Sequence, residues 1–205
     1  MADLPVPVPT IEFNLASTGM SKGIAQTHGP QILVRGELAF GHLYLGGYAK
    51  NVTSATSKAE AAAVIGARTS AAGLDLAVSA AWKRAIRPSR GSDSNALEVS
   101  GSVARRIGRM TPRISVVWSP DDLGATGRTI FAEASASYIV GKTLVASAAL
   151  GRRQRTGGLD YTAWNAGMSW NPYKPITLDL RYYDTDANAG QPFRPRLVAS
   201  GRVRF

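Results

Sequence analysis

The 205-residue sequence contains no cysteine. This absence excludes disulfide bonds, cysteine-ligated zinc and thiol catalysis, and it is compatible with an oxidising compartment, where free thiols are a liability. Long apolar runs are also missing, because no stretch approaches the roughly 18 consecutive apolar residues that a transmembrane helix requires. A helical membrane protein is therefore excluded, although 44% of the residues are hydrophobic.

Histidine is scarce, since His28 and His42 are the only two in the chain. An imidazole-based triad or metal site therefore has almost no material. The acidic pairs beside the expected loops are Asp121 with Asp122 and Asp184 with Asp186. Loop solvation explains both pairs better than catalysis, which would also need a nucleophile close by. We therefore predict that the protein is not an enzyme and has no catalytic residue, metal site or cofactor.

Acidic residues are outnumbered, with 14 Asp and Glu against 24 Lys and Arg and a net charge of +10. In a soluble protein this excess would make nucleic acid the first partner to consider. Here the basic residues are scattered, without a basic helix, an RNA-binding motif or an aromatic platform, so we predict no nucleic-acid partner. Short basic clusters between the expected strands are Lys83 and Arg84 with Arg87 and Arg90, and Arg152, Arg153 and Arg155. A solvated surface remains the alternative explanation of these clusters.

The sequence does contain a recurring period-two alternation of apolar and polar residues. In residues 74–83, for example, Leu74, Leu76 and Val78 share one face, whereas Asp75 and Ser79 lie on the other. The pattern recurs in segments whose expected full length is about nine to twelve residues, which suits tilted strands that span a membrane, although the clearest alternation often covers only part of a segment. The twelve predicted strands are residues 11–16, 31–38, 42–52, 59–68, 74–83, 97–103, 113–119, 130–137, 143–151, 160–170, 176–183 and 197–205. Four of them, 42–52, 59–68, 143–151 and 160–170, are assigned by spacing more than by pattern.

The connections between these strands alternate between five short turns and six longer loops. This alternation is typical of an up-and-down antiparallel transmembrane β-barrel with both termini on the short-turn, periplasmic side. We predict an all-β fold with a Pro-rich periplasmic arm at residues 1–9 and the barrel at residues 10–205. Met1 directly before a Pro-rich leader is expected to be a start codon placed on a mature chain whose export signal was removed.

A soluble barrel or β-sandwich is the alternative, because alternation by itself cannot show which face lies inside. Three features favour the membrane barrel: small and Ser-rich polar faces, opposite charges on those faces, and the last residue. The chain ends in Phe205, with Leu197, Ala199, Gly201 and Val203 in step with it. This pattern resembles the C-terminal signal by which outer-membrane barrels are recognised for assembly. We therefore expect Phe205 and its strand to contact the barrel-assembly machinery.

Two parts of the chain carry a family resemblance. Residues 21–27 (SKGIAQT), 29–31 (GPQ), 44–52 (YLGGYAKNV), 160–167 (DYTAWNAG) and 180–186 (LRYYDTD) resemble the opening and closing segments of the TorF family of porins. Ala25 departs from the family pattern, which usually has Ser at that position, and the middle of the chain matches only in its strand rhythm. The resemblance implies an outer-membrane barrel and a pore, without a substrate.

If the apolar faces meet lipid, the polar faces define a lumen. The residues predicted to line it are Arg35, Glu37, Lys83, Glu98, Arg113, Glu133, Asp179, Arg181, Arg202 and Arg204. We expect passive diffusion of small solutes, with a modest preference for anions because of a basic mouth. The alternative is a plugged structural or adhesive barrel whose basic loops bind lipopolysaccharide or a protein partner. In both cases the expected surroundings are outer-membrane lipid and lipopolysaccharide.

Overall fold

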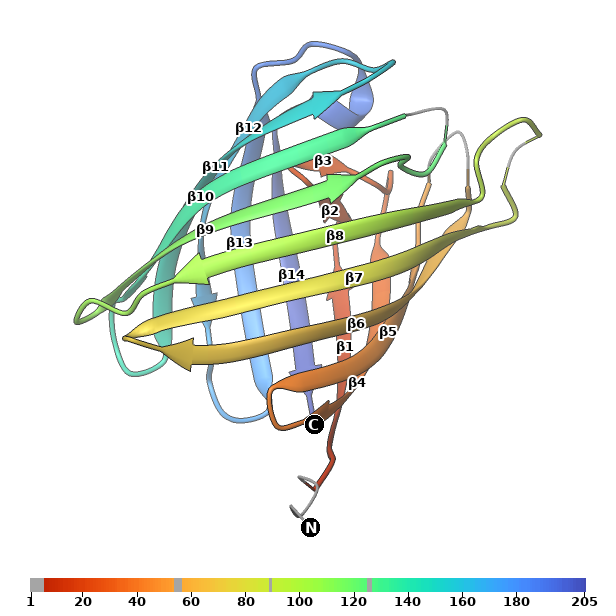
Figure 1. Cartoon of the computed structure of the whole chain (residues 1–205). Coiled ribbons are helices and arrows are strands. Elements are labelled where there is room, and N and C mark those ends of the chain that lie inside the picture. Colours follow the sequence, from red (N-terminus) through yellow and green to blue (C-terminus); the bar gives the residue numbers. More distant parts are fainter. Residues whose placement is uncertain (1–5, 54–56, 89, 125–126) are drawn as a thin grey trace.

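The computed structural model describes residues 6–53, 57–88, 90–124 and 127–205, and these form a closed antiparallel barrel (Figure 1). The barrel strands are β1 (Val8–Ala16), β4 (Gln31–Phe40), β5 (Leu43–Asn51), β6 (Ala59–Ala71), β7 (Leu74–Ile86), β8 (Asn95–Ala104), β9 (Met110–Ser119), β10 (Thr129–Ile139), β11 (Leu144–Arg155), β12 (Tyr161–Trp170), β13 (Ile176–Thr185) and β14 (Arg196–Arg204). The remaining elements are a short hairpin, β2 (Met20–Ser21) and β3 (Ile24–Ala25), and the 3-10 turn η1 (Gln191–Phe193). Each barrel strand corresponds to one of the twelve predicted segments, so the predicted fold class is confirmed.

The first and last strands close the barrel. Strand β1 pairs with β4 on one side and with β14 on the other, so that Glu12 lies between Arg35 and Arg204. Ile11 and Phe205 exchange both backbone hydrogen bonds, at 3.0 and 2.9 Å. Closure leaves no free sheet edge, which is the condition for strands to cross a bilayer.

Contacts that skip a strand identify the inside of the barrel. Arg68 Nη2 on β6 donates to Glu37 Oε1 on β4 over 2.5 Å, across β5. Arg181 Nη2 on β13 donates to Ser147 Oγ on β11 over 2.7 Å, across β12. Such contacts are possible only on the concave side of a sheet, so these polar faces point into the lumen.

The opposite face of each strand is apolar and points outward. Val78, Ile65 and Leu180 are 60%, 57% and 51% exposed, and large apolar side chains of the other strands accompany them. A water-soluble barrel has the reverse polarity, with its apolar side chains inside. An apolar band of this extent on a monomer marks a surface for lipid.

Aromatic side chains lie at both ends of the outer surface. Trp82, Trp118 and Trp164 point outward near the loop ends of β7, β9 and β12, whereas Tyr138 and Trp170 lie near the short-turn ends of β10 and β12. This is the arrangement of the aromatic girdles at the two membrane interfaces.

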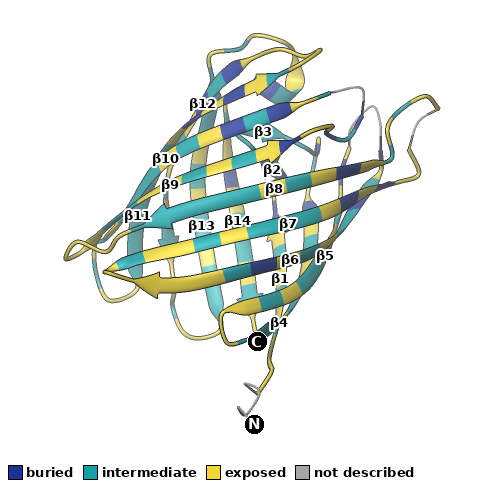
Figure 2. Cartoon of the chain, in the orientation of Figure 1, coloured by how far each residue is buried: buried dark blue, intermediate teal, exposed yellow. Residues whose placement is uncertain are grey.

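The barrel is filled unevenly along its length. Buried residues gather toward the end that carries the long loops, and the strands are mostly exposed or half-buried toward the end with the short turns and both termini (Figure 2). No helix in the described part of the chain is long and apolar enough to cross a membrane. The predicted arm at residues 1–9 is only partly described, since residues 1–5 lie outside the described residues and β1 already begins at Val8.

Candidate functional site in the barrel lumen

The connection between β1 and β4 folds back into the barrel. Strands β2 and β3 form a two-residue hairpin whose turn residues, Lys22 and Gly23, have φ angles of 50° and 84°. Positive φ at both central positions is characteristic of a type I′ turn, in which Asn-Gly is the favoured pair. A lysine in this conformation costs roughly 1 kcal/mol, so the surrounding contacts must hold it there. We call residues 17–30 the lumen hairpin segment.

One side of this hairpin packs against the wall of the barrel near β12. Ile24 contacts the buried group formed by Tyr161, Ala163 and Phe193, in which the Tyr161 and Phe193 rings meet edge to face at 5.3 Å. Tyr161 Oη donates to the backbone oxygen of Lys22 over 2.8 Å. A Cβ at Gly23 would overlap the Cβ of Ala163, so glycine is required there by space as well as by φ.

The other side of the hairpin meets a buried group of charges, which we call the outer-mouth cluster. Its members are Lys22, Lys50, Glu60, Lys83, Glu98, Asp122 and Arg153. None of these side chains is more than 17% exposed. The seven residues come from the hairpin segment, from strands β5, β6, β7, β8 and β11, and from the loop between β9 and β10.

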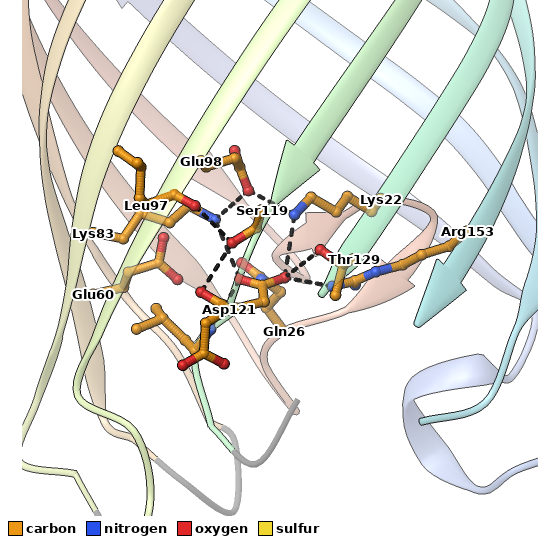
Figure 3. A network of polar contacts seen from close by, with 12 residues as sticks. Lys22, Gln26, Glu60, Lys83, Leu97, Glu98, Ser119, Asp121, Thr129 and Arg153 are labelled. Carbon is orange, nitrogen blue, oxygen red and sulfur yellow. Dashed lines mark hydrogen bonds and ion pairs between the residues drawn. The ribbon is translucent and has the colours of Figure 1, made fainter. Parts of the chain in front are cut away.

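Lys22 lies at the centre of this cluster (Figure 3). Its Nζ is 2.6 Å from Glu98 Oε2 and 3.4 Å from Asp122 Oδ2. Lys83 Nζ reaches the same Glu98 oxygen at 2.7 Å, and Arg153 Nη2 reaches Asp122 Oδ2 at 2.6 Å. Glu98 and Asp122 are thus each shared by two or more cations, and the hairpin is tied to β8 and to the loop between β9 and β10.

A second branch extends toward β5. Lys50 Nζ donates to Gln26 Oε1 over 2.5 Å and lies 3.4 Å from Glu60 Oε1, which also accepts a 2.6 Å hydrogen bond from Tyr48 Oη. The backbone N–H of Thr53 donates to the backbone oxygen of Gln26 over 2.7 Å. The hairpin segment is therefore held on three sides.

The loop groups of the cluster respond to this environment. Burial by itself would raise the pKa of Asp122, but Lys22, Lys83 and Arg153 outweigh it and lower that pKa to about 2. The pKa of Lys22 is lowered, first by burial and then by the positive charge of Lys83. The Asp122 shift reflects the three cations around its carboxylate, and the Lys22 shift reflects chiefly the burial of its ammonium group.

All ten residues predicted to line the lumen have inward-facing positions in the strand register. They fall into two groups. Lys83 and Glu98 belong to the outer-mouth cluster, and the other eight lie near the middle of their strands or in the half of the barrel next to the short turns. Whether these residues line a conducting pore stays a prediction.

Arg181 is the most connected residue of the short-turn half. It contacts Asp179 Oδ2 at 3.1 Å and donates to Asn165 Oδ1 over 2.8 Å and to Ser147 Oγ over 2.7 Å. In contrast, Arg113 is exposed to the lumen and donates to Ser102 Oγ over 2.8 Å. The short-turn half of the lumen therefore contains a cation held by several contacts, Arg181, and a more exposed cation, Arg113.

Two predictions made for the loop end are wrong. The basic cluster at residues 152–155 is not a loop, because β11 continues to Arg155. Arg153 points inward and is 8% exposed, whereas only its neighbour Arg152 faces outward, toward Asp160 and Asp186. Asp122 is not a solvated loop residue either, since it is 7% exposed and accepts four hydrogen bonds, from Lys22, the Leu123 backbone, Thr129 and Arg153. Residues 125–126 of the predicted loop at 121–127 lie outside the described residues.

The lumen prediction also missed Lys22, Lys50 and Glu60. Lys50 and Glu60 lie in the two segments whose alternation is blurred by alanine and glycine, so their face could not be assigned. The Lys-Gly pair at residues 22–23 is a turn signal, but nothing local indicates that the turn points into the barrel. Among the described residues, no group of three or more His, Asp or Glu side chains is arranged to hold a metal ion.

Comparisons with known proteins identify similar barrels. No protein-family model matches the sequence, and no curated protein matches it. Among solved structures, the KdgM porin in complex with disordered oligogalacturonate has a TM-score of 0.68 at 9% identity, covering 96% of this chain and 99% of that one. The NanC porin has a TM-score of 0.64 at 5% identity, with coverages of 96% and 98%. An outer-membrane channel from Pseudomonas putida F1 has a TM-score of 0.54 at 12% identity, with coverages of 100% and 97%. At these identities the likeness establishes the fold.

Proposed function

We propose that the protein is an outer-membrane porin-type channel for the passive diffusion of small solutes. The observation that carries this proposal is the polarity of the barrel, which has an apolar outer band and a lumen face with charged side chains, several of them exposed. A barrel that only anchored a surface domain would have no need of exposed arginines such as Arg35 and Arg113 inside it. The fold shared with porins and channels supports the proposal.

The proposal extends to membership of the TorF family of porins and to the orientation of the barrel in the outer membrane. The segments that resemble the TorF family include residues 21–27, which form most of the lumen hairpin, so the resemblance covers the part of the chain that would control a pore. The loop end would face outward, toward lipopolysaccharide, and the termini would face the periplasm. The C-terminal strand ending at Phe205 would be recognised by the barrel-assembly machinery.

A modest preference for anions follows from the lumen charges. Arg35 near the middle of β4 is exposed to the lumen, as are Arg113, Arg202 and Arg204 in the short-turn half, and their guanidinium groups would meet a passing ion. In the outer-mouth cluster, four cations face three carboxylates. Both ends of the passage thus favour negative solutes by electrostatic attraction.

Planar-bilayer recording with the purified, refolded chain tests this proposal. Discrete current steps are expected. In an asymmetric potassium chloride gradient, the reversal potential should be displaced from zero toward the equilibrium potential of chloride. The absence of any step at any voltage would refute the channel, and a cation-selective reversal potential would refute the anion preference alone.

The second candidate is a plugged structural or adhesive barrel. One observation favours it: the lumen hairpin segment is fixed to the wall by ion pairs on one side and by Ile24 on the other. If this segment closes the lumen completely, the exposed basic loops would serve lipopolysaccharide or a protein partner. The same recordings separate the two candidates, because a plug gives no current and a constriction gives a small one.

A further inference from the structure

A polar cavity lies beside the lumen hairpin at the loop end of the barrel. Its volume is about 250 Å³, and its charged lining residues are Lys22, Glu60, Lys83, Asp122, Arg153 and Arg155. The charged lining residues come from the hairpin, from the wall strands β6, β7 and β11, and from the loop after β9. The cavity is therefore part of the outer mouth, at the loop end of the barrel.

The charges around this cavity do not balance. Four cations and two carboxylates line it. Two further charges lie just outside the cavity. Glu98, which contacts Lys22 and Lys83, adds one negative charge, and Lys50, which contacts Glu60, adds one positive charge. The positive excess is therefore unchanged. An excess of buried positive charge is unfavourable unless a counter-charge accompanies it. The lowered pKa of Lys22, caused by burial and then by Lys83, agrees with this excess.

Arg153 supplies an independent observation. Its Nη2 donates to Asp122 over 2.6 Å and its Nη1 to Tyr161 Oη over 3.5 Å. Its Nε is buried and has no hydrogen-bond partner among the described residues. The residue is 8% exposed and lines the cavity. The unpaired Nε–H leaves this buried guanidinium incompletely satisfied, and a planar or tetrahedral oxyanion is the acceptor that suits the fork of donors of a guanidinium group.

We propose that this cavity is a binding site for the oxyanion group of a small solute, with the Arg153 guanidinium group as a donor and Lys22, Lys83 and Arg155 as counter-charges. The ligand class is a carboxylate, sulfate or phosphate group. A volume near the lower end for ligand pockets restricts the occupant to about the size of one sugar acid. The role of the site in solute entry rests on the proposed channel function, whereas the binding itself does not.

Isothermal titration calorimetry of the detergent-solubilised barrel tests the site without any need for conduction. The probes are inorganic sulfate, inorganic phosphate and glucuronate, with glucose as the neutral control, all at constant ionic strength in potassium chloride. We expect saturable binding of the oxyanions and none of glucose. Tighter binding of glucuronate would identify a sugar carboxylate as the source, and tighter binding of the inorganic ions would identify a free oxyanion. Failure of all three oxyanions to saturate would overturn the proposal.

Two neighbouring arginines give a matched pair of variants. Arg153→Gln should weaken oxyanion binding at least tenfold, because it removes both a charge and the free donor. Arg152→Gln removes the same charge from the adjacent position on the outer face, where the side chain is 52% exposed, and should leave binding unchanged. An equal loss in both variants would mean that only the general charge of the protein matters, and the proposed site would be wrong.

A third variant has the opposite expected sign. Asp122→Asn keeps acceptor and donor atoms near Arg153 and Leu123 but removes a competing negative charge, so it should tighten oxyanion binding severalfold. A variant that merely disturbed the fold would weaken binding, as Arg153→Gln does. Weakening by Asp122→Asn in a barrel that still shows heat-modifiable migration would therefore count against the site. Binding without bilayer current would refute the channel and leave the site intact, and current without binding would do the reverse.

Discussion

Lys22 Nζ and Glu98 Oε2 lie 2.6 Å apart in the lumen, although 76 positions separate the two residues in the chain. The contact joins the turn of the lumen hairpin segment to the far wall of the barrel at β8. In the proposed channel, this contact would place the narrowest part of the lumen beside the hairpin.

The hairpin turn should control conductance. Gly23→Ala would place a Cβ against Ala163 at a φ of 84°, which displaces the turn, so we expect single-channel conductance to increase or become noisy. Gly73→Ala is the matched control, because Gly73 has a φ of 73° in a short turn and a Cβ there would meet nothing within 4 Å. Bilayer recording of both variants decides the matter: equal behaviour of the two would mean that the hairpin does not limit the current.

Arg181 should influence ion selectivity from the short-turn half. Replacing it with Gln leaves Asp179 without its 3.1 Å ion pair, so the reversal potential should shift toward cations. Charges on the outer surface act through water and are screened beyond roughly 8–10 Å at physiological salt. Arg152→Gln should therefore give a smaller shift that vanishes in concentrated salt. A larger shift from Arg152 than from Arg181 would contradict this ordering.

Arg153 requires a revised expectation for selectivity. As part of a predicted loop cluster it would have had little effect, but its inward position at the constriction gives it close contact with passing ions. Arg153→Gln should therefore shift the reversal potential toward cations at least as much as Arg181→Gln does. The comparison of the two shifts, recorded in the same salt gradient, locates the narrowest part of the passage.

Acid should loosen the outer mouth. The pKa of Asp122 is lowered to about 2, because Lys22, Lys83 and Arg153 outweigh the opposing effect of burial. A carboxyl with a lowered folded-state pKa contributes stability above its unfolded pKa near 4, and this contribution is lost as the pH falls through about 2. The contribution is about 2 kcal/mol.

The temperature of heat-modifiable migration on gels, measured between pH 6 and pH 2, reports this loss. It should fall in the wild-type barrel between about pH 4 and pH 2, with a flatter profile for Asp122→Asn, whose side chain cannot titrate. Identical profiles for the two proteins would show that another group governs acid stability.

The last residue should matter for assembly more than for stability. Phe205 is 72% exposed on the outer face, so its side chain contributes little packing, although its backbone closes the pair with Ile11. Deleting Phe205 should reduce insertion in cells severalfold, while Phe205→Tyr keeps the terminal aromatic and should insert normally. Fractionation of outer membranes measures insertion, and refolding yield in detergent measures stability. Normal insertion of the truncated chain would remove the case for a terminal recognition signal.

The strand pattern of this protein could be read from its sequence because it is local information. Successive side chains of a strand point to opposite faces, so Leu74 and Asp75 reveal a two-sided strand without knowledge of its neighbours. The alternation of short and long connections likewise indicates which ends of the strands meet. Where alanine and glycine blur the contrast, as around Lys50 and Glu60, the strand was still located by spacing but its faces were not.

Only the tertiary structure decided what occupies the lumen. The sequence identified residues 21–27 as distinctive and Lys22 with Gly23 as a turn, but the direction of that turn depends on Glu98, Asp122 and Tyr161, which lie 76, 100 and 139 positions away. Alternation likewise cannot distinguish the inside of a barrel from the outside, because a strand shows the same apolar–polar alternation whichever of its two faces points into the lumen. The choice is made when the sheet closes: strand-skipping contacts such as that of Arg181 with Ser147 exist on the concave face alone, and charged side chains find their partners there.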